Sequence, residues 1–182
     1  MNLLIRALIF TGFLVSFSAH AIDGFILSFG KGIDDTLVQS RSTNGANQIS
    51  AGLTFDSELS FAHPLVGFAQ NHYEFYLSQI SHQQTINIVA LRPTFTFWPT
   101  PEKKSRWFWQ AGLGLAMFNE RNFGEIELST NWQFNTMLGI GRMIDKNHQH
   151  SLTLRYNHYS NAYIKTPNPG IDTISLDWVS RL

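Results

Sequence analysis

The chain has 182 residues, no cysteine, and 13 basic against 13 acidic side chains, so its length suits one domain and its net charge is zero. The balanced charge excludes the strongly basic surface of nucleic-acid-binding proteins, and we expect no nucleic-acid partner. The absence of cysteine excludes a disulfide framework, cysteine-based zinc sites and a cysteine nucleophile.

The N-terminal segment has the pattern of a secretory signal peptide. Arg6 precedes an apolar run that ends at Phe17, and the small residues needed for cleavage follow in Ser-Ala-His-Ala at 18–21. The apolar run is shorter than the roughly 20 residues that a membrane-spanning helix needs. We therefore predict a signal peptide over residues 1–21 and one domain over residues 22–182.

The remainder of the chain alternates between apolar and polar residues, as strands with one buried face do. Turn-forming residues divide this pattern into eight segments. The expected strands are Gly24–Gly32, Gln48–Asp56, Leu65–Leu77, Thr85–Trp98, Trp107–Met117, Trp132–Gly141, His150–Asn161 and Asp172–Leu182. Segments 57–64, 99–106 and 145–149 then become short turns at one end, and the longer connections lie at the other end.

Two of these strands carry additional information. Pro93 has no N–H to donate to a ladder, which predicts a bulge or a local break in the fourth strand. In the fifth strand, large apolar residues from Trp107 onward share one face, and Gly112 and Gly114 lie on the other. Small residues on the inner face would allow an eight-stranded barrel to close around a narrow lumen.

Alternation alone does not decide which face points inward. A soluble barrel of the lipocalin type turns its apolar face to the lumen, whereas a membrane barrel turns it to the lipid. The faces opposite the apolar ones are rich in Gly, Ser, Thr, Asn and Gln, and aromatic residues gather near strand ends, as in an interfacial girdle, at Trp98, Trp107, Trp132, Tyr156 and Trp178. We therefore predict an all-β fold, an eight-stranded antiparallel transmembrane β-barrel.

The last two strands contain a candidate catalytic constellation. His158 and Ser160 continue the apolar face of one strand, and Asp172 begins the corresponding face of the next. Residues two apart on a strand are separated by about 6.6 Å, and neighbouring strands by about 4.8 Å, so an antiparallel hairpin would gather the three side chains. Ser160 could then act as nucleophile, His158 as base, and Asp172 as the group that orients the imidazole. The plainer alternative is a chance His-x-Ser, which any barrel tolerates near the water interface.

The segment His158-Tyr159-Ser160-Asn161-Ala162, with Ile164-Lys165, Pro167-Asn168 and Gly170-Ile171 after it, resembles the C-terminal signature of PagL-type lipid A 3-O-deacylases. The sequence Gln-Ala-Gly-Leu-Gly at 110–114 is also similar. The resemblance implies an outer-membrane barrel with a serine-histidine-acid triad facing the lipid, in which Ser160 is the nucleophile and His158 the base. The acid of that family is usually Glu, and this sequence has Asp172 at the matching place.

The resemblance also implies the rest of the chemistry. It indicates Asn161 and Asn168 as oxyanion donors, although Pro167–Gly170 can equally be read as turn residues. It implies a serine hydrolase, integral to the outer membrane and without a cofactor, that removes the 3-position acyl chain from lipid A or lipopolysaccharide among outer-membrane lipids. The resemblance does not decide whether the protein forms a homo-oligomer. The sequence contains no metal-binding motif. The alternatives are a non-enzymatic structural or adhesive barrel and a soluble lipid-binding barrel.

Overall fold

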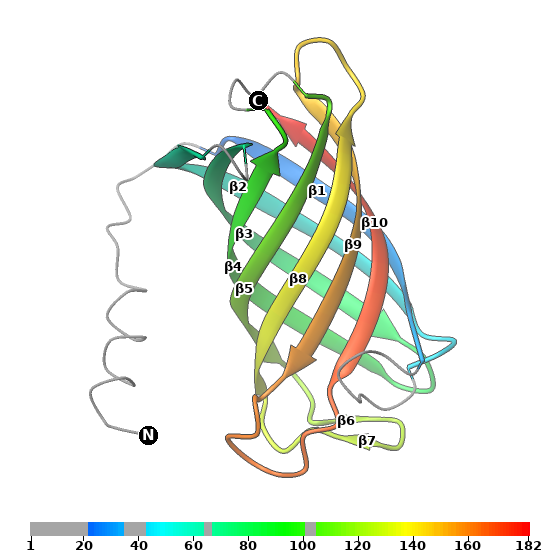
Figure 1. Cartoon of the computed structure of the whole chain (residues 1–182). Coiled ribbons are helices and arrows are strands. Elements are labelled where there is room, and N and C mark those ends of the chain that lie inside the picture. The colour runs from blue at the N-terminus through cyan, green and yellow to red at the C-terminus, as the bar shows by residue number, and fades with distance from the viewer. Residues whose placement is uncertain (1–21, 35–42, 64–66, 101–104) are drawn as a thin grey trace, which may run out of the picture.

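The computed structural model describes residues 22–34, 43–63, 67–100 and 105–182, and the strands in them close into an antiparallel barrel (Figure 1). The predicted signal peptide, residues 1–21, lies outside the described residues. The eight barrel strands are β1 (Gly24–Gly32), β2 (Asn47–His63), β3 (Gly67–Ser81), β4 (Thr85–Trp98), β5 (Trp107–Phe118), β8 (Trp132–Met143), β9 (His150–Ser160) and β10 (Ile171–Arg181). β6 (Asn122–Phe123) and β7 (Ile126–Glu127) form a separate small hairpin between β5 and β8. Among the described residues, no helix is long and apolar enough to cross a membrane.

Each barrel strand pairs with its neighbours in chain order, and β1 closes the ring by pairing with β10. The prediction of an eight-stranded antiparallel barrel is therefore confirmed. Pro93 interrupts the ladder on one side only. It pairs with Tyr73 of β3, whereas the pairs between β4 and β5 stop at Leu91↔Leu115 and resume at Thr94↔Gly112 in the same register. The expected disturbance is thus a local break without a bulge.

The prediction of a turn at 57–64 is wrong, because β2 continues to His63. The register between β2 and β3 shifts between Asp56 and Ser60, which marks a bulge or irregularity. Such an irregularity disrupts the strict alternation that the sequence interpretation relied on. The pairs between β1 and β2 end at Gly24↔Thr54, so the last part of β2 pairs with β3 alone.

Apolar side chains cover the outside of the barrel, and the inside is filled by many polar side chains together with buried apolar clusters. Large exposed apolar residues come from strands all around the ring, and include Leu27, Phe29, Leu77, Trp109, Leu113, Leu138, Leu154 and Leu176. The buried side chains of the same strands include Glu74, Arg92, Thr94, Gln110, Asn135, Arg155 and Asp177. This arrangement is the reverse of a lipocalin-type barrel and is typical of a barrel surrounded by lipid. The soluble alternative is therefore wrong.

A buried ion network occupies the middle of the lumen. Glu74 accepts hydrogen bonds from Arg92 at 2.6 Å and from Arg155 at 2.8 Å, and Arg155 also pairs with Asp177 at 3.1 Å. Gly112 lies on the inner face, as predicted, and a Cβ atom on it would lie 2.9 Å from Arg92 Cδ, so this small residue makes room for the Arg92 side chain. Two interior cavities measure about 20 Å³ each. A space of that size holds about one water molecule and cannot admit an acyl chain.

Candidate active site

The candidate site lies where β9 ends and β10 begins, at the same end of the barrel as the β6–β7 hairpin (Figure 1). Asp172 pairs directly with His158 across the two strands. The flanking residues Tyr159 and Ile171 belong to the buried apolar cluster inside the barrel. Because successive side chains point to opposite faces of a strand, His158 and Asp172 lie on the outer face, and so does Ser160, two residues beyond His158.

The imidazole of His158 and the carboxylate of Asp172 are hydrogen-bonded, with Nδ1 and Oδ1 2.8 Å apart. A carboxylate can only accept, so the proton of this bond belongs to Nδ1. In a neutral imidazole this leaves Nε2 as an acceptor. The Asp172 side chain is completely buried and that of His158 is 10% exposed, so bulk water hardly competes for the bond.

Three further groups hold Asp172, and the sequence interpretation missed all of them. The Tyr156 hydroxyl donates to the same Oδ1 atom at 2.6 Å. The main-chain oxygen of Asp172 accepts from the Thr43 hydroxyl at 2.7 Å and from the Ile33 N–H at 3.2 Å. The sequence placed Tyr156 only in the aromatic girdle, and the strand register, which sets Asp172 diagonally across from it, is the signal that could have found this contact.

Ser160 is the last residue of β9, and its side chain is half-buried. Its partner in β8 is Phe134. In the part of the chain that the structure describes, no hydrogen bond joins the Ser160 hydroxyl to His158. The structure thus brings His158 and Asp172 into contact, and it leaves Ser160 beside them on the same face.

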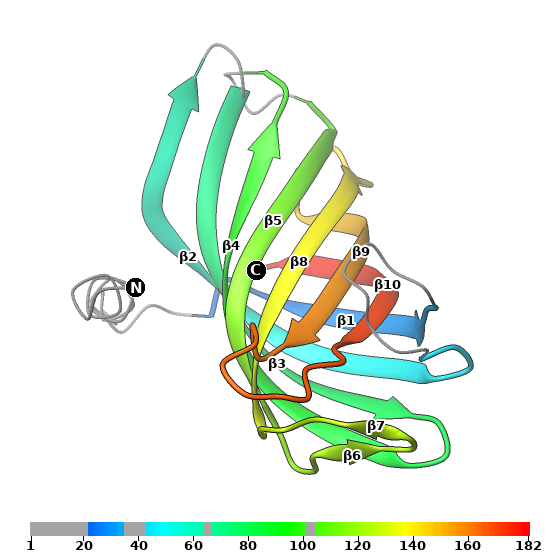
Figure 2. The same cartoon turned by 60° about the horizontal axis from the view of Figure 1, so that its bottom comes forward.

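The segment 161–170, which connects β9 to β10, is held by hydrogen bonds to Ser129 (Figure 2 shows it beside the β6–β7 hairpin). The Asn161 side-chain amide donates to the Ser129 hydroxyl at 2.8 Å, and that hydroxyl donates to the Pro167 carbonyl at 2.7 Å. Asn168 accepts the main-chain N–H of Asn161 through Oδ1 at 2.8 Å. Both predicted oxyanion residues therefore help to fold this segment, and Asn168 does so through its oxygen rather than its NH₂ group.

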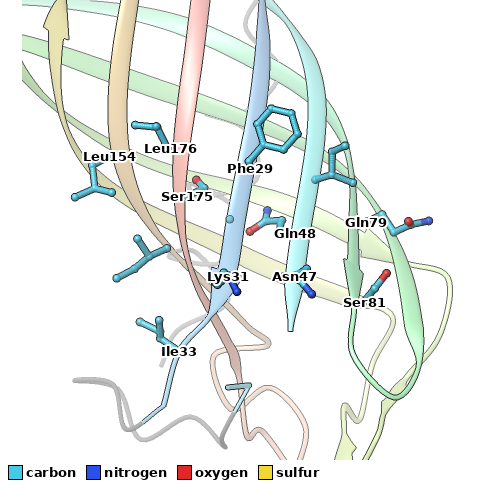
Figure 3. Close-up of a pocket in the computed structure, with 13 residues that line it drawn as sticks. Phe29, Lys31, Ile33, Asn47, Gln48, Gln79, Ser81, Leu154, Ser175 and Leu176 are labelled. Atoms are coloured by element: carbon cyan, nitrogen blue, oxygen red, sulfur yellow. The ribbon is translucent and has the colours of Figure 1, made fainter. Parts of the chain in front are cut away.

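An open groove of about 760 Å³ runs along the outer surface next to the site (Figure 3). Phe29, Leu154 and Leu176 line it from β1, β9 and β10. Ile174, which follows Asp172 on the outer face of β10, also lines it. The groove therefore begins two residues from the candidate triad and is largely apolar.

Comparison with known proteins identifies the family. A family model described as lipid A 3-O-deacylase (PagL) matches residues 47–179. The chain belongs to the PagL family. The resemblance predicted from the C-terminal motif is thereby confirmed, and the matched segment contains Ser160, His158, Asp172, Asn161 and Asn168.

Relatives in the PagL family agree with this assignment. A lipid A deacylase PagL from Bordetella bronchiseptica is 35% identical over 86 residues, covering 47% of this chain and 45% of that protein. One from Pseudomonas aeruginosa is 36% identical over 69 residues, covering 38% of this chain and 39% of that protein. The chain thus spans less than half the length of these two relatives. A crystal structure of the outer membrane enzyme PagL has the same fold, with a TM-score of 0.69 and 23% identity over 86% of this chain and 99% of that one.

Proposed function

We propose that this chain is a serine esterase of the outer membrane that hydrolyses the ester between lipid A and its 3-position acyl chain. The observation that carries the proposal is the 2.8 Å bond between His158 and Asp172 on the lipid-facing surface, with Ser160 on the same face. Ionisable groups are costly next to hydrocarbon, and a paired histidine and aspartate there are best explained by function. Membership of the PagL family supplies the substrate class.

In the proposed reaction, the Ser160 hydroxyl oxygen attacks the ester carbonyl carbon while His158 Nε2 takes the hydroxyl proton. The tetrahedral intermediate collapses, the bond to the sugar oxygen breaks, and His158 returns the proton to that oxygen. Water then attacks the acyl-serine with His158 again as base, which releases the fatty acid and restores Ser160. Asp172 keeps the proton on Nδ1 and stabilises the imidazolium that forms twice in the cycle.

The missing bond between Ser160 and His158 is compatible with this cycle. Catalytic hydrogen bonds are often long before substrate binds and tighten in the complex. For the oxyanion, Asn168 is the better of the two candidates, because the bond through its Oδ1 leaves both N–H groups of its amide to donate. The Asn161 amide already donates to buried Ser129.

The apolar groove beside Asp172 supports an acyl substrate. Its lining of Phe29, Leu154, Ile174 and Leu176 could hold a hydrocarbon chain that extends from an ester at the triad. The interior cavities are too small for such a chain. A substrate that reaches the site by lateral diffusion in the outer leaflet would need no passage through the lumen.

The test is mass spectrometry of lipid A from Gram-negative cells that lack a 3-O-deacylase and express wild type, Ser160→Ala or Ser151→Ala. Ser151 is a matched control, since it lies on the same strand and is buried on the lumen side. We expect wild type and Ser151→Ala to yield lipid A lighter by one acyl chain, and Ser160→Ala to leave it intact. Equal deacylation by wild type and Ser160→Ala would refute the serine mechanism, and unchanged lipid A in all three strains would favour a non-enzymatic barrel.

A further inference from the structure

The carboxylate of Asp172 accepts hydrogen bonds from two side chains of β9 on one oxygen atom. His158 Nδ1 lies 2.8 Å from Oδ1, and the Tyr156 hydroxyl lies 2.6 Å from it. We propose that Tyr156 is a positioning residue of this site, whose phenol fixes the Asp172 carboxylate in the orientation that His158 requires. This inference rests on the proposed function, and it assigns Tyr156 no contact with substrate.

The strand register gives Tyr156 access to Asp172. Tyr156 pairs with Ile174, and His158 pairs with Asp172, so Tyr156 lies diagonally across from the carboxylate on the same outer face. Diagonal neighbours in an antiparallel pair are about 7–8 Å apart between backbones, which an aromatic side chain can span. The ring is half-buried at the barrel surface, and its hydroxyl is directed to the carboxylate.

The main chain of Asp172 is already anchored by other groups. Its carbonyl oxygen accepts hydrogen bonds from Thr43 and Ile33, and the pairing of β10 with β9 holds its backbone opposite His158. The two bonds on Oδ1, from His158 and Tyr156, restrict rotation of the side chain, because turning the carboxylate would break both.

Burial makes the second donor important. The Asp172 side chain has no exposed area, so a bond lost from its carboxylate is not replaced by bulk water. A phenol hydroxyl without a partner beside hydrocarbon is also unfavourable. The bond between Tyr156 and Asp172 therefore satisfies both groups and holds the acceptor that selects the Nδ1 tautomer of His158.

Tyr156→Phe removes the hydroxyl and keeps the ring. With purified lipid A in detergent micelles, we expect kcat to fall roughly tenfold or more, the range for a lost hydrogen bond to a charged group, while KM stays within about twofold. In an Asp172→Ala background, the same change should cause no further loss, because the group on which Tyr156 acts is gone. Tyr73→Phe is the matched control, since Tyr73 is a half-buried residue on β3, which pairs with neither β9 nor β10.

A full rate in Tyr156→Phe, or the same fold-loss with and without Asp172, would overturn the inference. A second measurement does not require turnover: the ¹H NMR signal of His158 Nδ1–H, assigned by its loss in His158→Gln. We expect Tyr156→Phe to move this signal and Tyr73→Phe to leave it in place. An unmoved signal in Tyr156→Phe contradicts the inference even if lipid A is not deacylated, whereas intact lipid A with a moved signal contradicts only the proposed function.

Discussion

Replacing Glu74 by glutamine would test whether the buried ion network stabilises the barrel. Glu74 is fully buried, and its carboxylate lies between two guanidinium groups. Oε2 accepts from Arg92 at 2.6 Å, and Oε1 accepts from Arg155 at 2.8 Å and lies 3.1 Å from His72 Nε2. The substitution keeps the side-chain volume, removes the negative charge, and turns an NH₂ group toward groups that also donate.

The magnitude follows from what remains after the change. Removing one partner of a buried ion pair typically costs about 3–5 kcal/mol, because the other charge stays buried without compensation. Arg155 retains Asp177 at 3.1 Å, and Arg92 retains bonds to Asn135 at 2.6 Å and Asn157 at 2.8 Å. These bonds offset part of the loss, so we expect a decrease of about 3 kcal/mol in the free energy of unfolding, the lower end of that range.

Urea unfolding in lipid vesicles, followed by tryptophan fluorescence, measures this decrease. With a slope of about 2–3 kcal/mol/M, the midpoint should fall by roughly 1 M. Glu127→Gln is a matched control, because Glu127 is exposed in the β6–β7 hairpin, and it should leave the midpoint unchanged. A midpoint for Glu74→Gln within about 0.3 M of wild type would refute the reasoning, since about 1 kcal/mol is too little for an uncompensated buried charge.

Three other changes have defined outcomes. Asp172→Asn keeps the side-chain size but loses the charge, and kcat should fall by about 10²–10⁴ in the lipid A assay; an unchanged rate would remove Asp172 from the triad. Gly114→Ala would force a methyl group against the Leu91 carbonyl, so it should lower the urea midpoint, by an amount equivalent to about 1–3 kcal/mol, and wild-type stability would contradict the packing. Main-chain N–H groups of the same turn, that of His150 with the largest effect and two others with smaller effects, hold the pKa of the exposed Asp145 carboxyl below its ordinary value of 3.8. A carboxyl group whose pKa is lower in the folded than in the unfolded state contributes stability at pH values above its unfolded pKa. That stability is lost as the pH falls through the folded-state pKa. Asp145→Asn should therefore weaken hydrogen-exchange protection of the His150 amide at pH 7 but not near pH 2, and equal protection of both proteins at pH 7 would refute this.

Much of the fold could be predicted because each strand of an eight-stranded barrel shows a local alternation of apolar and polar residues. The predicted bounds of Gly24–Gly32 and Thr85–Trp98 agree with β1 and β4. The polar composition of the opposite faces, including Gly112 and Gly114, correctly indicated which face lies inside. The prediction failed for residues 57–63 of β2, because the register shift near Asp56 and Ser60 interrupts the period of two on which the argument depended.

The site was predictable to the extent that it depends on one hairpin. Asp172 and His158 are only 14 residues apart, and antiparallel pairing of consecutive strands brings them together. The contact of Tyr156 with Asp172 depends on a diagonal register and a side-chain rotamer, which composition does not reveal. The contact between Ser129 and Asn161 was even harder to predict, because the two residues are 32 positions apart and Ser129 belongs to the connection between β7 and β8. This contact depends on the paths of two long connecting segments.

The depth of the site in the barrel agrees with the chemistry proposed for it. His158 and Ser160 are the last outward-facing residues of β9, and Leu152 and Leu154, the outward residues before Tyr156, are exposed apolar side chains of the outer surface. The segment that follows, 161–170, is mostly exposed and contains polar residues. The candidate triad therefore lies at the boundary between hydrocarbon and polar surroundings. In a lipid, the ester that joins an acyl chain to a sugar lies at that same boundary, so a nucleophile deeper in the hydrocarbon would meet only methylene groups, and one further out would meet only sugar and phosphate.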